Sequence, residues 1–127
     1  MANKEIIKEW TILAKEDVDL AAHLIEEKWF YRAALAHLQQ AIEKYTKAFL
    51  ISRSWELRRI HDLETLFAEG MQYEPFFKDY VNFGRELTAY YTETRYPPLD
   101  DHEPSQKDAT RLLQKSKEFI GKIERFL

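Results

Sequence analysis

The chain contains no cysteine, so neither a disulfide framework nor a thiolate metal site is available to it. Only three glycines and four prolines occur in 127 residues, which favours long helices joined by few turns. The net charge of −3 excludes a general basic surface, so any contact with nucleic acid has to be local. No apolar run approaches the roughly 20 residues of a membrane-spanning helix. Residues 1–5 lack a signal-peptide layout, and we therefore expect a cytoplasmic protein with no membrane segment.

The length predicts a single domain over residues 1–127, large enough to bury a hydrophobic core without disulfides or structural metals. Apolar residues recur at helical spacing in five segments. These segments are about 4–27, one that follows residue 31 and ends around residues 52–55, a short one from residue 61 to 70, 74–91 and 105–127. The connection at residues 28–31 is short, so the first two helices should be antiparallel. The predicted fold class is all-α, an antiparallel up-and-down four-helix bundle with an additional short helix.

An acidic residue, Asp17, interrupts the apolar row of the first helix. The members of this row are Ile6, Trp10, Leu13, Asp17, Leu20 and Leu24, with Ile7, Ala14 and Ala21 beside them, and we expect this face of the helix to be turned inward. Asp17 either sits at the edge of the row and pairs with a basic group, or orients a side chain in a polar pocket. Its candidate partners are Arg32, Lys44, Lys47 and Arg95.

Local signals mark where the later helices begin and end. His61 or Asp62 is a candidate N-cap for the short helix, and Gly70 is a candidate C-terminal stop. Pro75 suits the first turn of the fourth helix. Ser105 followed by Asp108 predicts a capping-box start for the last helix.

Two polar segments are candidate binding surfaces. Gln40, Lys44 and Lys47 form a row beside the apolar face of the second helix, where a solvent face would more often carry pairs of opposite charge. Residues 52–59 hold three arginines within seven positions, the densest positive patch of the chain. This segment is either a solvated loop or a local phosphate contact, because arginine forks match phosphate geometry.

Four short patterns follow one another in an order known from one protein family. They are QQAIEKYTKA at residues 39–48, the set Trp10, Ala14, Asp17 and Ala21, HDL at residues 61–63 with Leu66, and Tyr91 followed by TRYP at residues 94–97. In this order they resemble the motifs of the HEPN family, which comprises small all-helical domains of prokaryotes and some eukaryotes. The resemblance extends along nearly the whole chain, and it implies the fold more narrowly than the function, since the chemistry varies between members.

Many HEPN proteins are metal-independent ribonucleases with an arginine, a gap of four to six residues and a histidine near the end of the penultimate helix. The resemblance places Arg95 and His102 at this position, with a gap of six residues that is acidic and interrupted by prolines. In such a pair the histidine moves a proton near neutral pH and the arginine stabilises the phosphorane charge. Arg95 as an anchor for its loop and His102 as an ordinary loop histidine remain the alternatives. Arg32 and His37 have a gap of four residues but lie on the second helix, where the motif does not belong, so His37 is interpreted as a core or interface residue.

Motifs for metal and cofactor chemistry are missing from the sequence. None of the four histidines has an acidic residue three positions before it, and no H-E-x-x-H occurs. No phosphate-cradling glycine loop occurs either, so only side chains are available to hold a nucleotide. We expect no metal and no cofactor.

The leading functional prediction is a HEPN binding module. The resemblance implies a homodimer, and it implies a role as the helical partner of a small nucleotidyltransferase of the toxin–antitoxin type, with nucleotide binding in some members. We predict that Gln40, Lys44, Lys47 and Arg95 line a shared polar cleft for a phosphate-bearing ligand or an acidic partner. The alternatives are an RNA-cleaving enzyme acting through Arg95 and His102, and a non-catalytic dimeric scaffold.

Overall fold

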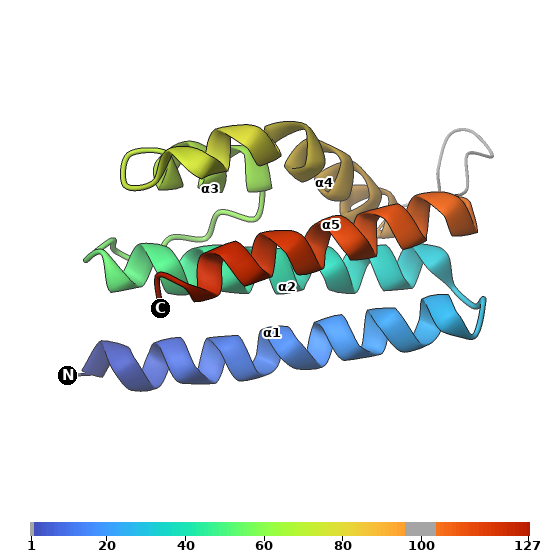
Figure 1. Ribbon diagram of the computed structural model, residues 1–127, viewed down its shortest axis with the longest axis horizontal. Helices are drawn as coiled ribbons and strands as arrows, with labels where there is room; N and C mark the ends of the chain where they lie inside the picture. Colours follow the sequence, from blue (N-terminus) through green and yellow to red (C-terminus); the bar gives the residue numbers. More distant parts are fainter. Residues whose placement is uncertain (1, 96–103) are drawn as a thin grey trace.

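The computed structural model describes residues 2–95 and 104–127, and the described parts are helices joined by short connections (Figure 1). The elements in chain order are α1 (Ala2–Glu26), α2 (Tyr31–Ser52), α3 (Leu63–Gly70), the 3₁₀ helix η1 (Pro75–Tyr80), α4 (Val81–Arg95) and α5 (Gln106–Glu124). The fold is therefore an all-α bundle of four long helices with the short helix α3 added, as predicted. No helix within the described ranges is both long enough and apolar enough to cross a membrane.

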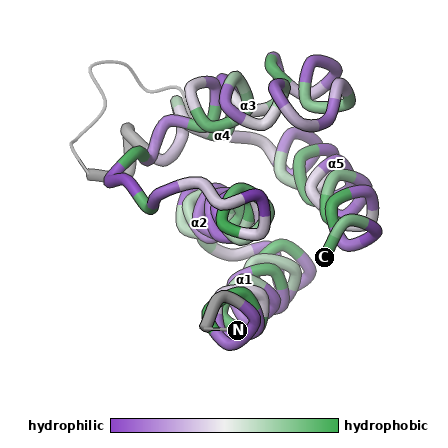
Figure 2. The backbone as a smooth tube through the Cα atoms, turned by 90° about the vertical axis from the view of Figure 1, so that its left-hand side faces the viewer, coloured by the Kyte–Doolittle hydropathy of each residue, from purple (hydrophilic) through white to green (hydrophobic). Residues whose placement is uncertain are grey.

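Helix α2 is the central element of the bundle. In Figure 1 α1 lies below it, α5 runs beside it and α3 and α4 lie above it, and in Figure 2 other helices lie below, above and to the right of it. It packs against α1, α3, α4 and α5. Its buried side chains therefore include polar ones, Gln39, Thr46 and Lys47. These polar groups need partners inside the protein because little water reaches them.

The buried face of α1 differs from the predicted one. Ile6, Leu13 and Leu20, which the apolar row placed in the core, are 39%, 47% and 42% exposed. Ala14 and Ala21, one position further along the helix, are fully buried. Small residues at this contact let α1 and α2 approach closely, and the larger side chains are displaced to the rim of the interface. The prediction was wrong for these three residues, whereas Trp10 and Leu24 of the same row pack against the core. Helical spacing alone does not tell which edge of a broad apolar face is covered.

The local start signals act as predicted. The Asp62 side chain accepts a hydrogen bond from the backbone N–H of Thr65, so Asp62 is the N-cap of α3. Ser105 and Asp108 form a reciprocal capping box at the start of α5. Pro75 opens a helical segment, but that segment is the 3₁₀ helix η1, and α4 begins only at Val81. The predicted single helix over residues 74–91 is thus two elements.

Gly70 and Gly84 are required by close packing. Gly70 ends α3 without a positive φ, so it is no left-handed cap. A Cβ atom at Gly70 would lie 2.6 Å from the Phe77 ring, and one at Gly84 would lie 2.8 Å from the Phe67 ring. Both rings belong to an aromatic cluster between α3, η1 and α5, in which Phe67 stacks on Phe119 with centroids 5.1 Å apart. This cluster holds the upper layer of the bundle on α2 and α5.

Candidate functional site

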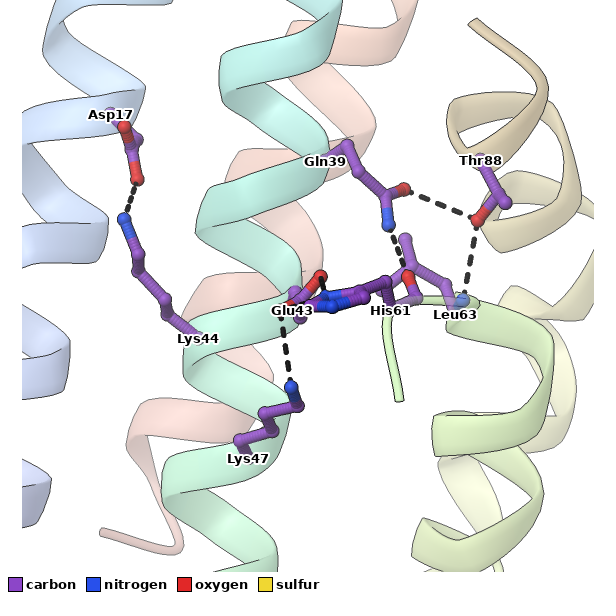
Figure 3. A network of polar contacts seen from close by, with 8 residues as sticks. All are labelled: Asp17, Gln39, Glu43, Lys44, Lys47, His61, Leu63 and Thr88. Carbon is purple, nitrogen blue, oxygen red and sulfur yellow. Dashed lines mark hydrogen bonds and ion pairs between the residues drawn. The ribbon is translucent and has the colours of Figure 1, made fainter. Parts of the chain in front are cut away.

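Two clusters of polar side chains lie on opposite flanks of α2 (Figure 3). The first, called here the α1–α2 cluster, consists of Asp17, His37 and Lys44. The second, called the α2–α3 cluster, consists of Gln39, Glu43, Lys47, His61 and Thr88. Steps of three and four residues keep side chains on one face of a helix, so His37 and Lys44 share one flank of α2, and Gln39, Glu43 and Lys47 share the other.

The α1–α2 cluster is organised around the Asp17 carboxylate. One oxygen lies 3.0 Å from His37 Nδ1, and the other accepts a hydrogen bond of 2.5 Å from Lys44 Nζ. The Asp17 side chain is only 12% exposed, whereas those of His37 and Lys44 are 32% and 28% exposed. The carboxylate is thus held inside the interface, and its two basic partners reach the surface.

Gln40 belongs to the same face of α2 as the α1–α2 cluster. It lies three residues after His37 and four residues before Lys44, so all three side chains are neighbours along the helix. Gln40 is half-buried, and its amide has no hydrogen bond to any residue that the structure describes. The row therefore offers an amide, an ammonium and an imidazole to a ligand at the rim of the α1–α2 interface.

The α2–α3 cluster contains a chain of hydrogen bonds that joins three helices. Gln39, which is fully buried, donates to the His61 carbonyl at 2.7 Å. The Thr88 hydroxyl of α4 donates to the Gln39 amide oxygen at 3.2 Å and accepts from the Leu63 N–H at 3.2 Å. One buried glutamine thereby ties α2 to the start of α3 and to α4.

Glu43 and Lys47 complete the α2–α3 cluster. Lys47 Nζ donates to Glu43 at 3.2 Å, and the two side chains are only 6% and 15% exposed. The His61 ring, which is 54% exposed, lies 3.1 Å from the same carboxylate and covers it from outside. Lys47 is therefore enclosed and already paired within the subunit, unlike Lys44 at the rim.

Tyr45, next to Lys44 in the sequence, points away from both clusters. Its hydroxyl donates to a Glu124 carboxylate oxygen of α5 at 3.2 Å. Burial, together with the nearby Glu124 charge, raises the pKa of Tyr45 above its ordinary value. The phenol therefore stays protonated throughout the physiological range and is no base.

The ribonuclease pair falls at the edge of the described structure. Arg95 is the last residue of α4, which is the penultimate long helix, but its side chain lies outside the described part, and so does His102 entirely. Their pairing stays a prediction. The competing histidine, His37, is held by Asp17 across the α1–α2 interface, in keeping with its interpretation as an interface residue.

The three arginines of the basic segment have different surroundings. Arg53 lies over the Phe49 ring at 4.8 Å, whereas Arg58 pairs with Glu69 at 3.6 Å and lies near Trp55. Arg59 is exposed. Within residues 2–95 and 104–127, no group of three or more histidine, aspartate or glutamate side chains is placed to hold a metal ion.

The sequence predicts some of the contacts in the two clusters and gives no sign of others. Lys44 was one of the four predicted partners of Asp17, and the structure selects it. The contact of His37 with Asp17 was missed, although its helical register with Lys44 placed both on one face. Gln39 and Thr88 carry no signal in the sequence, because a buried glutamine is recognised only when its partners on other helices are known.

Comparison with known proteins supports the same fold. The model of one family, described as HEPN domain, matches residues 7–126. A crystal structure of TT1696 from Thermus thermophilus superposes with a TM-score of 0.82, at 22% sequence identity, over 95% of this chain and 98% of that chain. No curated protein matches the chain.

Proposed function

The chain belongs to the HEPN domain family, and on that premise we propose that it is a binding module for a phosphate-bearing ligand such as a nucleotide. The observation that carries the proposal is the shared Asp17 carboxylate, which orients Lys44 and His37 at the rim of the α1–α2 interface. An anionic ligand gains most from donors that are already held in place, because less side-chain entropy is lost on binding.

The charges of the α1–α2 cluster suit an anion. Asp17 is enclosed and Lys44 and His37 reach the surface, so an approaching ligand meets the ammonium, the imidazole and the Gln40 amide before the carboxylate. Lys44 keeps two further ammonium hydrogens, and Gln40 keeps both amide hydrogens for a phosphate. Arg95, whose side chain lies outside the described part, stays a predicted further contact of the ligand.

Lys47 has a different place in this proposal. Its ammonium is enclosed and bonded to Glu43, so a direct contact with a ligand requires that this pair opens. We therefore assign Lys44 and Gln40 the larger share of ligand contact. Lys47 acts mainly by keeping the neighbouring turn of α2 in position.

Assembly is the second part of the proposal. We infer a homodimer, or a complex with a small nucleotidyltransferase of the toxin–antitoxin type, as family membership implies. The exposed apolar side chains of α1, Ile6, Leu13 and Leu20, support an interface on this helix, since they follow one another at seven-residue spacing. Analytical ultracentrifugation of the pure protein tests the dimer, and a monomer at micromolar concentration would contradict it.

The ligand proposal is tested by thermal unfolding with and without ATP or AMP. We expect a ligand-dependent rise of the midpoint, which Lys44→Ala and Gln40→Ala reduce. Lys117→Ala, an exposed lysine on α5, is the matched control and should leave the rise unchanged. A rise that persists in both α2 variants would show that the nucleotide binds elsewhere.

The rival function is metal-independent RNA cleavage through Arg95 and His102. It is favoured by one feature, the position of Arg95 as the last residue of the penultimate long helix. Structured RNA is incubated with the protein in EDTA. Cleavage that disappears in Arg95→Ala and His102→Ala variants would replace the binding module by the enzyme, and intact RNA would leave the module in place.

A further inference from the structure

A cavity of about 730 Å³ opens at the end of the bundle where α1 begins and α2 and α5 end. Figure 1 shows the two termini and the end of α2 gathered at this side, and Figure 2 looks onto it. Lys4, Lys8 and Thr11 of α1 line one wall, Ser52 and Ser54 a second, and Phe126 and Leu127 a third. Its volume lies within the range of roughly 300 to 1,000 Å³ that small-molecule sites occupy.

The charge of this cavity differs from that of two other hollows on the described part of the molecule. No acidic side chain lines it, and neither the Lys4 nor the Lys8 ammonium has an ion pair or hydrogen bond with any residue that the structure describes. The groove between α1, α2 and α5 instead combines Lys15 and Lys117 with Asp19 and Glu124. The hollow on α4 and α5 likewise holds acids, and its Arg111 is bound to Glu86. The bundle-end cavity thus offers two cations, and none of its lining residues has an acidic side chain.

Two of the three hydroxyl groups that line the cavity already donate hydrogen bonds within the protein. The Ser52 hydroxyl donates to the Phe49 carbonyl and accepts from Arg53, and the Thr11 hydroxyl donates to the Lys8 carbonyl. The Ser54 hydroxyl has no hydrogen bond to a described residue. An anion in the cavity is therefore offered two ammonium groups and one free hydroxyl.

The partial negative charge at the C-terminal ends of two helices offsets part of the positive charge of the two lysines. The C-terminal ends of α2 and α5 bring carbonyl groups to the same region, although those of Leu50 and Ile51 already accept backbone hydrogen bonds. A small anion alone should therefore bind weakly. The ligand needs an apolar part as well, for which Ile7 and the exposed edge of Phe126 supply the contact surface.

We propose that this cavity binds an amphiphilic phosphomonoester, with its phosphate on Lys4 and Lys8 and its apolar body on Ile7 and Phe126. Phosphate suits this wall better than carboxylate because its three terminal oxygens can accept from two ammonium groups and the Ser54 hydroxyl at once. The site is separate from the α1–α2 cluster, so it does not depend on the function proposed above.

The test titrates octyl phosphate, below its micelle concentration, into the full-length protein by isothermal titration calorimetry. We expect one site, and we expect Lys4→Gln combined with Lys8→Gln to weaken binding at least about tenfold, since two charge-assisted contacts are lost. Lys15→Gln, an exposed lysine on the same helix, is the matched control and should bind as the unmodified protein does. Equal binding by the Lys4/Lys8 variant would overturn the proposal.

The probe's two halves are tested separately. Inorganic phosphate or octyl glucoside binding as tightly as octyl phosphate would overturn the amphiphile assignment, because one half of the probe would then be unused. Octanoate binding as tightly would overturn the choice of phosphate and assign the site to a fatty-acid carboxylate.

Filling the cavity gives an independent check. Thr11→Phe adds a ring to the wall without removing a core side chain, and it should abolish binding of octyl phosphate. Lys44→Ala should leave that binding intact and lower only the nucleotide response. Undiminished binding by the filled variant would place the probe outside this cavity and overturn the proposal.

Discussion

The two flanks of α2 carry similar residues, but one flank is open to a ligand and the other stabilises the fold. Lys44 and Lys47 are three positions apart, and each pairs with one carboxylate inside the subunit. The Lys44 side chain is 28% exposed at the rim of the α1–α2 interface, whereas that of Lys47 is 6% exposed and covered by His61. The first arrangement leaves donors for a ligand, and the second uses its donors to hold α2, α3 and α4 together.

The difference shows that a lysine's partner does not decide its role; its access to water does. In the α1–α2 cluster the carboxylate is enclosed and the basic groups reach the surface. In the α2–α3 cluster the ammonium is enclosed together with Glu43, so breaking that pair leaves a desolvated charge. Mutations in the two clusters should therefore separate stability from binding.

The largest effect is expected from Lys47→Met, which removes the ammonium and leaves Glu43 enclosed. We expect the free energy of unfolding to fall by about 3 kcal/mol, because an unpaired charge remains with little water around it. Urea denaturation at pH 7 measures the change. Adding Glu43→Gln should restore most of the loss, and a double variant as unstable as the single one would contradict the pairing argument.

Gln39→Leu should have a smaller effect than Lys47→Met. The substitution keeps the side-chain volume but removes the hydrogen bonds with the His61 carbonyl and Thr88, at a cost of about 1.5 kcal/mol. Gln40→Leu is the matched control, since this neighbour has no hydrogen bond to a described residue, and it should stay near the original stability. Equal losses in the two variants would show that the buried network does not stabilise the fold.

Lys44→Met tests the other flank. Its pair with Asp17 is partly exposed, so stability should fall by less than about 1 kcal/mol, discounted for solvent screening. The nucleotide-dependent rise in the unfolding midpoint should nevertheless disappear. The comparison between the flanks fails if Lys44→Met is as destabilising as Lys47→Met in the same urea experiment.

The smallest effect is expected at the exposed pair of Glu64 and Arg85, which joins α3 and α4. The Arg85 hydrogen bond lowers the pKa of Glu64. Because the folded pKa lies below the unfolded one, this contribution is present above the unfolded pKa of about 4.3 and is lost as pH falls through the folded value.

Arg85→Met should raise the pKa of Glu64 toward its ordinary value, as followed by NMR titration of the side-chain carboxyl. Stability at pH 7 should hardly change, because both side chains are well exposed. An unchanged Glu64 pKa would mean that the pair does not persist in solution.

Several features of the fold could be predicted because they depend on neighbours in the chain. The Asp62 cap and the Ser105–Asp108 box need only residues three positions apart. The split of residues 74–91 into η1 and α4 could not be predicted, since Pro75 is compatible with either kind of helix. Gly70 was assigned to the end of a helix correctly, but its reason, the Phe77 ring, comes from a different element.

In the candidate site, too, some features could be predicted from the sequence and others depend on how the helices pack. The row of Gln40 and Lys44 on one face of α2 follows from helical spacing alone, and so does the presence of an acid at Asp17. The enclosure of Lys47 does not follow, because it depends on how α3 crosses α2. Even Lys44 as the partner of Asp17 was one choice among four, decided by the register between α1 and α2.

By itself the sequence determined five helical segments, their caps and the bundle class, since each of these depends on residues three or four positions apart. Its motifs also indicated the family by resemblance. The tertiary structure alone decided that Ala14 and Ala21 rather than Leu13 and Leu20 meet α2, and that one lysine is enclosed while its neighbour stays at the rim. The physical reason is that helical spacing defines a face, whereas the rotation and depth at which two faces meet depend on the volumes of side chains from both helices.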